Sequence, residues 1–297
     1  MGKDNLLPLR RFHGALHEKR MARENERAIR HMVRDGRRAS LWAEGQPPAE
    51  ENYPVDFVIT WLDGGDPAWI AEKNRYLPAD ELTVKDNDAA RFRDWGTLRY
   101  WFRGVEQYAP WVRTVFLVTW GHVPAWLNRA CPKLQVVTHG EFIPPAYLPT
   151  FSCFPTELNL WRIDGLSEHL VYFNDDMFLT APVEKSDFFR GGLPRHVPAA
   201  RPVYPREQMT AWEHMLFGTV GIINSRFDVR ACIQAHPEKW FSCRCPGEVE
   251  YNLRAWRDGR LTGMVYPHLA IPYRASTAER VWYTCRERLE IGRASCR

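Results

Sequence analysis

The sequence HLVYFNDDMFLT, residues 169–180, decides the fold class of this chain. Its first half, Leu170–Phe173, is an apolar and aromatic run that is typical of a buried strand. Three polar residues follow at once, namely Asn174, Asp175 and Asp176. A strand of this kind delivers two carboxylates to the carboxyl edge of a sheet, which is where open α/β sheets bind ligands.

Two interpretations of the acidic pair stay open at this point. Adjacent carboxylates repel each other unless a cation or strong hydrogen-bond donors lie between them. A divalent ion that bridges Asp175 and Asp176 to a substrate phosphate would supply such a cation. The alternative is an ordinary turn, because Asn and Asp side chains bond their own backbone.

Apolar runs alternate with helical spacing on both sides of this stretch. Strands are predicted at 56–61, 114–119, 134–138, 170–173 and 219–223, and helices at 68–74, 95–108, 155–162 and 226–235. A capping-box sequence at 276–279 predicts a last helix that ends near Trp282. Strands separated by helices predict an α/β, Rossmann-like fold with a largely parallel sheet flanked by helices.

The basic character of the chain is concentrated at its start. Residues 1–40 contain 11 Lys or Arg and 5 Asp or Glu, a charge of +6, so the rest carries −2 of the net +4. Residues 1–42 are predicted to form a helix, either solvated or lying on an anionic membrane surface. The near-neutral body, and a leader without interleaved aromatics, argue against nucleic acid as a partner.

Composition sets the remaining limits. The chain has 297 residues, enough for one large or two modest cores. No apolar run reaches the roughly 18 residues that span a bilayer, and no signal-peptide core follows the charged start, so we expect a cytoplasmic or membrane-peripheral protein. The seven cysteines form no CxxC pair and are expected to be reduced thiols.

These observations predict three segments. Residues 1–50 form a basic helical leader and linker, residues 51–285 a single globular domain, and residues 290–297 resemble translated sequencing-adapter DNA.

Two further sequences carry candidate binding residues. Asp63 opens an Asp-Gly-Gly-Asp turn directly after the first predicted strand, a place where backbone often approaches a nucleotide or phosphate. Arg91 and Arg93 bracket a phenylalanine and precede Asp94. Guanidinium groups suit phosphate oxygens, whereas Asp94 is also a candidate helix cap. Both turns and caps are common enough that structural roles stay open.

His268 is the histidine with the most distinctive surroundings, because Pro267 and Pro272 bracket its loop and stiffen the local backbone. A lone histidine is more often structural than catalytic, and a stiff loop shifts the balance slightly toward a functional role, so both interpretations stay open.

Four stretches together resemble the Stealth family, which includes sugar-phosphate transferases of capsular polysaccharide synthesis and the phosphotransferase subunit that tags lysosomal enzymes. They are DFVITWLDGGDPAW at 56–69, the segment 91–128, the segment 148–179 with YFNDDMFL, and GMVYPHLAIPYRASTAERVW at 263–282. Their order and spacing make the resemblance far more specific than any one motif.

The resemblance implies a nucleotide-sugar transferase-like fold and a defined reaction. An acceptor hydroxyl on a glycan would attack a UDP-sugar, releasing UMP, in capsular or exopolysaccharide synthesis. It implies Mg²⁺ held by Asp175 and Asp176, and His268 as general base or as donor to the moving phosphoryl group. Substrate-binding roles fall to Asp63, Arg91, Arg93, Asp94, Glu157 and Asn174.

Two other functions remain to be separated from this one. A conventional glycosyltransferase would release UDP instead of UMP, and its metal-binding acidic motif resembles residues 174–176. A non-catalytic polyanion binder would act through the leader and lose its function on deletion of residues 1–45. The resemblance also implies a further block after Trp282, so we expect the chain as it stands to turn over little.

Overall fold

The computed structural model describes residues 7–44, 51–76, 92–196, 199–207, 209–242 and 246–291. The chain forms two compact units. We call residues 48–196 with 266–297 the sheet unit, and residues 1–47 with 197–265 the helical unit. The predicted division into segments 1–50, 51–285 and 290–297 stays a prediction.

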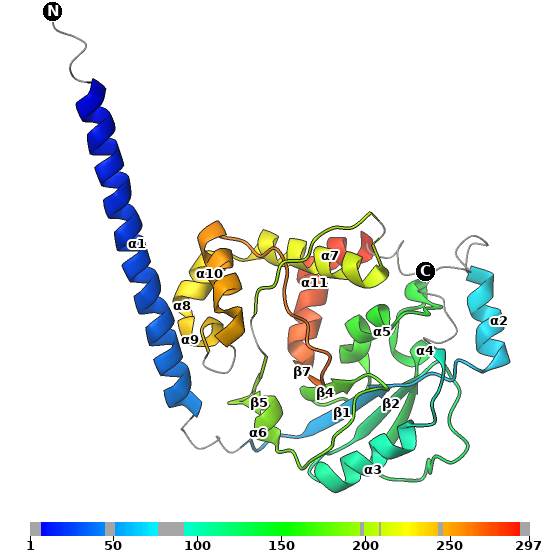
Figure 1. Ribbon diagram of the computed structural model, residues 1–297. Coiled ribbons are helices and arrows are strands. Elements are labelled where there is room, and N and C mark those ends of the chain that lie inside the picture. The colour runs from blue at the N-terminus through cyan, green and yellow to red at the C-terminus, as the bar shows by residue number, and fades with distance from the viewer. Residues whose placement is uncertain are drawn as a thin grey trace, which may run out of the picture. The chain divides into compact units, whose positions relative to one another are not determined.

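The sheet unit is built on five strands in the order β3-β2-β1-β4-β7. Its strands are β1 (Val55–Thr60), β2 (Val115–Thr119), β3 (Leu134–Thr138), β4 (His169–Phe173) and β7 (Ile271–Arg274). The first four are mutually parallel and β7 runs antiparallel to β4 at the edge (Figure 1). The predicted largely parallel α/β sheet is therefore confirmed.

Helices cover both faces of this sheet. The sheet unit contains α2 (Pro67–Tyr76), α3 (Leu98–Tyr108), α4 (His139–Phe142), α5 (Cys153–Asn159), α6 (Lys185–Phe188) and α11 (Ala275–Ile291). Short 3-10 turns at Pro145–Tyr147 and Leu160–Arg162, and a hairpin of β5 (Phe189–Arg190) and β6 (Leu193–Pro194), complete the unit.

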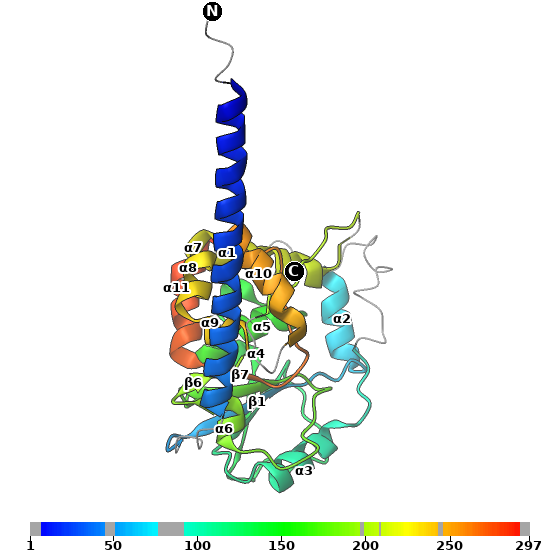
Figure 2. The ribbon, with the colours of Figure 1, turned by 60° about the vertical axis from the view of Figure 1, so that its left-hand side comes forward.

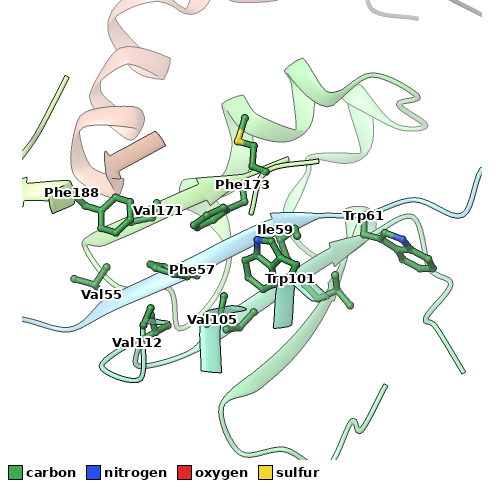
Figure 3. Packing of buried hydrophobic residues seen from close by; sticks show 14 of the residues in the cluster. Val55, Phe57, Ile59, Trp61, Trp101, Val105, Val112, Val171, Phe173 and Phe188 are labelled. Carbon is green, nitrogen blue, oxygen red and sulfur yellow. The ribbon is translucent and has the colours of Figure 1, made fainter. Parts of the chain in front are cut away.

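Alternate side chains of the central strands enter two separate cores. Phe57, Ile59 and Phe173 pack with Trp101 and Val105 of α3 on one face (Figure 3). Residues of opposite parity, such as Val58 and Tyr172, pack against Leu160, Ile163 and Phe142 on the other. Burial on both faces explains why these strands read as continuous apolar runs in the sequence.

Two features of the last segment differ from the sequence prediction. The final helix does not end near Trp282 but continues to Ile291. Ahead of it, the Pro-bracketed loop passes into β7, which contains Pro272. Proline is tolerated there because an edge strand has one side free of ladder partners.

The helical unit contains α1 (Leu7–Glu44), α7 (Ala211–Arg226), α8 (Val229–Ala235), α9 (Pro237–Trp240) and α10 (Val249–Asp258), with a 3-10 turn at Pro246–Glu248. The strand predicted at 219–223 is wrong, because these residues lie inside α7. A capping box joins Thr210 to Glu213 and starts this helix, and that local signal outweighs the β-branched run further along.

The predicted N-terminal helix is confirmed as α1, which runs beside α9 in both views (Figure 2). A side chain at Gly36 would meet the Pro237 carbonyl oxygen at 2.5 Å, so this glycine allows the close approach. Among the described residues, no helix combines the length and apolarity needed to cross a bilayer.

Candidate active site

The acidic pair lies in a tight turn directly after β4. The Met177 N–H donates to the Asn174 carbonyl oxygen at 3.2 Å, which returns the chain to the core at the buried Met177. Asp175 and Asp176 occupy the two tip positions and are exposed. The sequence is thus a turn, as one interpretation required, and the turn presents both carboxylates at the carboxyl edge of the sheet.

His268 meets Asp176 across 92 positions of sequence. Its Nε2 lies 3.0 Å from both carboxylate oxygens of Asp176. The strand register explains the meeting, because Ile271 at the start of β7 pairs with Tyr172 near the end of β4. Both side chains stay accessible, with 60% and 64% of their surfaces exposed. The structure therefore brings together two residues that the sequence identified separately.

The electrostatics of this edge favour the binding of a cation. Desolvation, followed by the negative charges of Asp176 and Asp94, raises the pKa of Asp175 to about 6. Asp94 does not cap α3, whose N-cap is Thr97; its Oδ1 instead accepts the Gly96 N–H at 2.8 Å. In the described residues no ion pair joins Asp175 to a basic group, so the negative charge there is uncompensated.

The residues at this edge fit one kind of magnesium site, in which the protein supplies only some of the ligands. Among the described residues, no three His, Cys, Asp or Glu side chains converge to form a complete protein cage for a metal. Mg²⁺ in phosphoryl-transfer sites needs no such cage, since it takes one or two carboxylates, several waters and the substrate's own phosphates. Asp175 and Asp176 match that donor set, and a cation would relieve their repulsion.

A buried polar chain lies behind the turn. Tyr172, buried on β4, donates to Asn174 Oδ1 at 2.7 Å, and its hydroxyl also lies 3.1 Å from Thr60 Oγ1. Glu157 of α5 hydrogen bonds to the same hydroxyl, and desolvation raises the pKa of this carboxyl to about 7. Glu157 is therefore linked to Asn174 through Tyr172, a residue that sequence reasoning treated only as part of a strand.

The Asp63 turn is tied to the neighbouring strand by a histidine that sequence reasoning set aside. The Asp63 carboxylate accepts the Gly65 N–H at 2.9 Å, while the Asp63 N–H donates to His122 Nε2 at 2.8 Å. His122 Nδ1 lies 3.1 Å from an Asp66 oxygen. His122 thus carries a hydrogen on Nδ1 and fixes this loop at the ends of β1 and β2.

Of the two candidate arginines, Arg91 and Arg93, only Arg93 lies in the part of the chain that the structure describes. Arg91 lies outside the described residues. Arg93 places its guanidinium 5.2 Å from the centre of the Trp95 ring, in a stacked contact on the surface beside Asp94. No described hydrogen bond joins Arg93 or Asp63 to Asp175, Asp176 or His268.

Comparison of the chain with known proteins shows which family it is similar to. The model of Stealth protein conserved region 1 matches residues 53–81, and that of conserved region 2 matches residues 91–196. The capsular polysaccharide phosphotransferase WcwK of Streptococcus pneumoniae is 38% identical over 77% of this chain and 68% of its own length. The receptor polysaccharide phosphotransferase WefC of Streptococcus oralis is 52% identical over 52% of this chain and 48% of its own. An exopolysaccharide phosphotransferase of Lactiplantibacillus plantarum is 39% identical over 77% and 66%.

Proposed function

This chain belongs to the Stealth family and is a sugar-phosphate transferase of polysaccharide synthesis, and we propose that its donor is a UDP-sugar. The acceptor is a hydroxyl group of a growing glycan. Its oxygen forms a bond to the β-phosphorus, and the bond from that phosphorus to the bridging oxygen breaks. UMP departs with the electron pair, and a phosphodiester joins the sugar to the acceptor.

The observation that carries this proposal is the contact between His268 and Asp176. An ionised Asp176 accepts the Nε2–H of the imidazole, which leaves the lone pair of Nδ1 free. His268 is then a general base that takes the proton from the acceptor hydroxyl as the new bond forms. Asp176 holds the ring in that tautomer and stabilises the imidazolium that results.

Asp175 and Asp176 are the proposed protein ligands of a divalent cation, which we take to be Mg²⁺. When bound, the ion neutralises charge on the donor phosphates. Asp176 has enough lone pairs to serve both the ion and His268. Desolvation and the neighbouring carboxylates raise the pKa of Asp175, and a bound cation would offset that effect by holding the carboxylate ionised.

The remaining predicted residues are proposed to position the donor. With its Oδ1 engaged by Tyr172, Asn174 has its amide N–H groups left to donate to a phosphate or sugar oxygen. Glu157 supports that arrangement through the same hydroxyl. Asp63 lines the nucleotide pocket, and Asp94 lies beside the metal ligands. Arg91 and Arg93 neutralise phosphate oxygens.

We place the reaction in the cytoplasm at the inner face of the membrane, with residues 1–42 as the contact. Leu41 and Trp42 of α1 are 60% and 70% exposed, and Arg37 and Arg38 beside them are exposed as well. An exposed Trp with flanking Arg is the combination that lies at anionic lipid surfaces.

Product analysis tests the proposal. The full chain, Mg²⁺, a panel of UDP-sugars and an oligosaccharide acceptor are incubated together, and the released nucleotide is separated chromatographically. UMP with a phosphate-bearing glycan supports phosphosugar transfer. UDP with a directly glycosylated product would show the glycosyltransferase alternative instead. His268→Ala serves as the negative control, with His214→Ala, on the helical unit, as the matched change elsewhere.

A further inference from the structure

The sheet unit has an exposed surface on which arginines and aromatic rings are paired. Arg93 lies over Trp95 at 5.2 Å, Arg99 over Trp126 at 5.6 Å and Arg103 over Tyr100 at 5.5 Å. We call these six residues the aromatic–arginine surface: Arg93, Trp95, Arg99, Tyr100, Arg103 and Trp126. Its members come from the loop before α3, from α3 itself and from the loop after β2.

These rings are not needed by the core. Trp95, Tyr100 and Trp126 are 72%, 57% and 42% exposed. On α3 the packing is done by Leu98, Trp101, Gly104 and Val105, which are buried on the other side of the helix. Three large aromatic residues left in water near one another mark an interaction site more often than a structural one.

The arginines of this surface keep their charge available. In the part of the chain that the structure describes, no ion pair within 4.0 Å is made by Arg93, Arg99 or Arg103, and the acidic residue of α3, Glu106, does not engage them. Stacking on a ring occupies the face of a guanidinium and leaves its N–H edge free for an anionic oxygen. The surface therefore offers flat apolar faces and positive edges together.

The surface also begins at the candidate active site. Arg93, proposed above to neutralise donor phosphates, stands at its near end, and Trp101 of α3 packs on Phe173, the last residue of β4 before the acidic turn, with ring centres 5.3 Å apart. A polymer lying along α3 would accordingly lead toward the acidic turn.

From these observations we infer that the aromatic–arginine surface binds the acceptor: a glycan chain that carries phosphodiester groups. Aromatic faces pack against the apolar faces of sugar rings, and guanidinium edges bind phosphate oxygens. The inference rests on the proposed function, since phosphosugar transfer builds this type of anionic glycan. A nucleic acid would fit the same pairs less well, because the body of the protein is not basic.

Direct binding tests the surface without requiring transfer. Fluorescence anisotropy with the full chain uses two labelled probes, a short hexose oligosaccharide joined by phosphodiesters and one of the same length joined by neutral glycosidic bonds. The double variant Arg99→Gln, Arg103→Gln is expected to bind the charged probe about tenfold more weakly than wild type and to bind the neutral probe equally well. Trp126→Ala is expected to weaken the binding of both probes severalfold.

Matched controls lie on α11, where Arg280→Gln and Tyr283→Ala change the same residue types at exposed positions. These controls should bind like the wild type. Slow hydrolysis of the UDP-sugar without acceptor reports the donor site and should be unchanged in the surface variants. Loss of that hydrolysis together with unchanged probe binding would overturn the inference by assigning the surface to the donor.

Competition separates the remaining partners. If single-stranded oligothymidylate displaces the charged probe with equal affinity, the surface binds polyanions in general and the inference is overturned. It is equally overturned if the variants lose only binding to anionic lipid vesicles, since the surface would then face a membrane. Failure of the chain to use any UDP-sugar would count against the proposed function and leave the probe-binding result intact.

Discussion

Two aspartates stand at opposite ends of the same sheet and have opposite surroundings. Asp56, at the start of β1, is fully buried and receives the guanidinium of Arg113 and the Ser167 N–H, the latter at 2.7 Å. Asp175, at the far end of β4, has negative neighbours, and its pKa is raised to about 6. The first carboxylate holds the fold together, whereas the second is the proposed ligand of a cation.

This difference shows how the parallel sheet separates stability from function. At its amino end, Asp56 raises the pKa of Arg113, so the pair stabilises its own charged form. At the carboxyl end two carboxylates lie side by side, Asp175 without an ion pair among the described residues and Asp176 against His268, and their mutual repulsion destabilises the folded state. Sites that bind and react are generally less stable than the scaffold that carries them.

The largest effect is expected from breaking the structural pair. Asp56→Ala leaves Arg113 and the Ser167 N–H without their acceptor, and we expect it to lower the free energy of unfolding by about 3 kcal/mol or more. Urea denaturation followed by circular dichroism measures this. Asp164→Ala, at an exposed position in the sheet unit, is the control and should stay within about 0.5 kcal/mol of wild type.

Changes at the carboxyl end of the sheet should lower the reaction rate and leave the stability of the fold nearly unchanged. His268→Ala removes the proposed general base and is expected to lower kcat about 100- to 10,000-fold while the melting temperature stays within a few degrees of wild type. Alanine at His122, His139 or His214 should lower kcat less. If all four variants had equal turnover, His268 would have a structural role only.

The acidic pair gives the sharpest contrast with Asp56. Asp175→Asn and Asp176→Asn are each expected to lower Mg²⁺-dependent turnover by at least about 100-fold. Asp175→Asn should also leave stability unchanged or raised, because it removes a desolvated charge and its repulsion from Asp176. Near-normal turnover in both variants, measured by UMP release over a range of Mg²⁺ concentrations, would refute the metal assignment.

The smallest effect is expected from Glu157 and depends on pH. Its pKa is raised from 4.5 to about 7, so the folded chain keeps a proton that the unfolded chain releases between these values. Stability is therefore lost as the pH rises through this interval, and the loss is complete above it. Glu157→Gln should be more stable than wild type by about 2 kcal/mol near pH 8, and about equal to it below pH 4.5. If the free energies of unfolding of the two proteins changed equally with pH, the raised pKa of Glu157 would be contradicted.

Much of the sheet unit could be predicted because its strands are buried on both faces. Continuous apolar runs located β1 to β4 within about a residue, and the polar break after Phe173 located the acidic turn. The association of His268 with Asp176 could not be predicted from spacing, since it depends on an edge strand that contains proline and pairs antiparallel. The position of Glu157 behind Tyr172 likewise requires the packing of α5 on the sheet.

The helical unit was harder to predict for a local reason. The sequence TVGII at 219–223 has the composition of a strand, yet it continues a helix that Thr210 and Glu213 have already started. The capping-box sequence at 276–279 predicted a helix that is present, but the helix begins at Ala275, the Ser276 N–H donates to Glu168 at 3.0 Å, and the helix ends later than predicted.

The antiparallel β7 has a consequence for how activity arises during biosynthesis. Asp176 emerges from the ribosome long before His268, and the two are held together only when Ile271–Arg274 adds to the edge of β4. A nascent chain that has already folded β1 to β4 would therefore display its carboxylates without the proposed base, His268. Pairing of β7 with β4 is therefore the folding step that assembles the proposed catalytic pair, and a chain cut short before residue 268 would keep the carboxylates and lack the histidine.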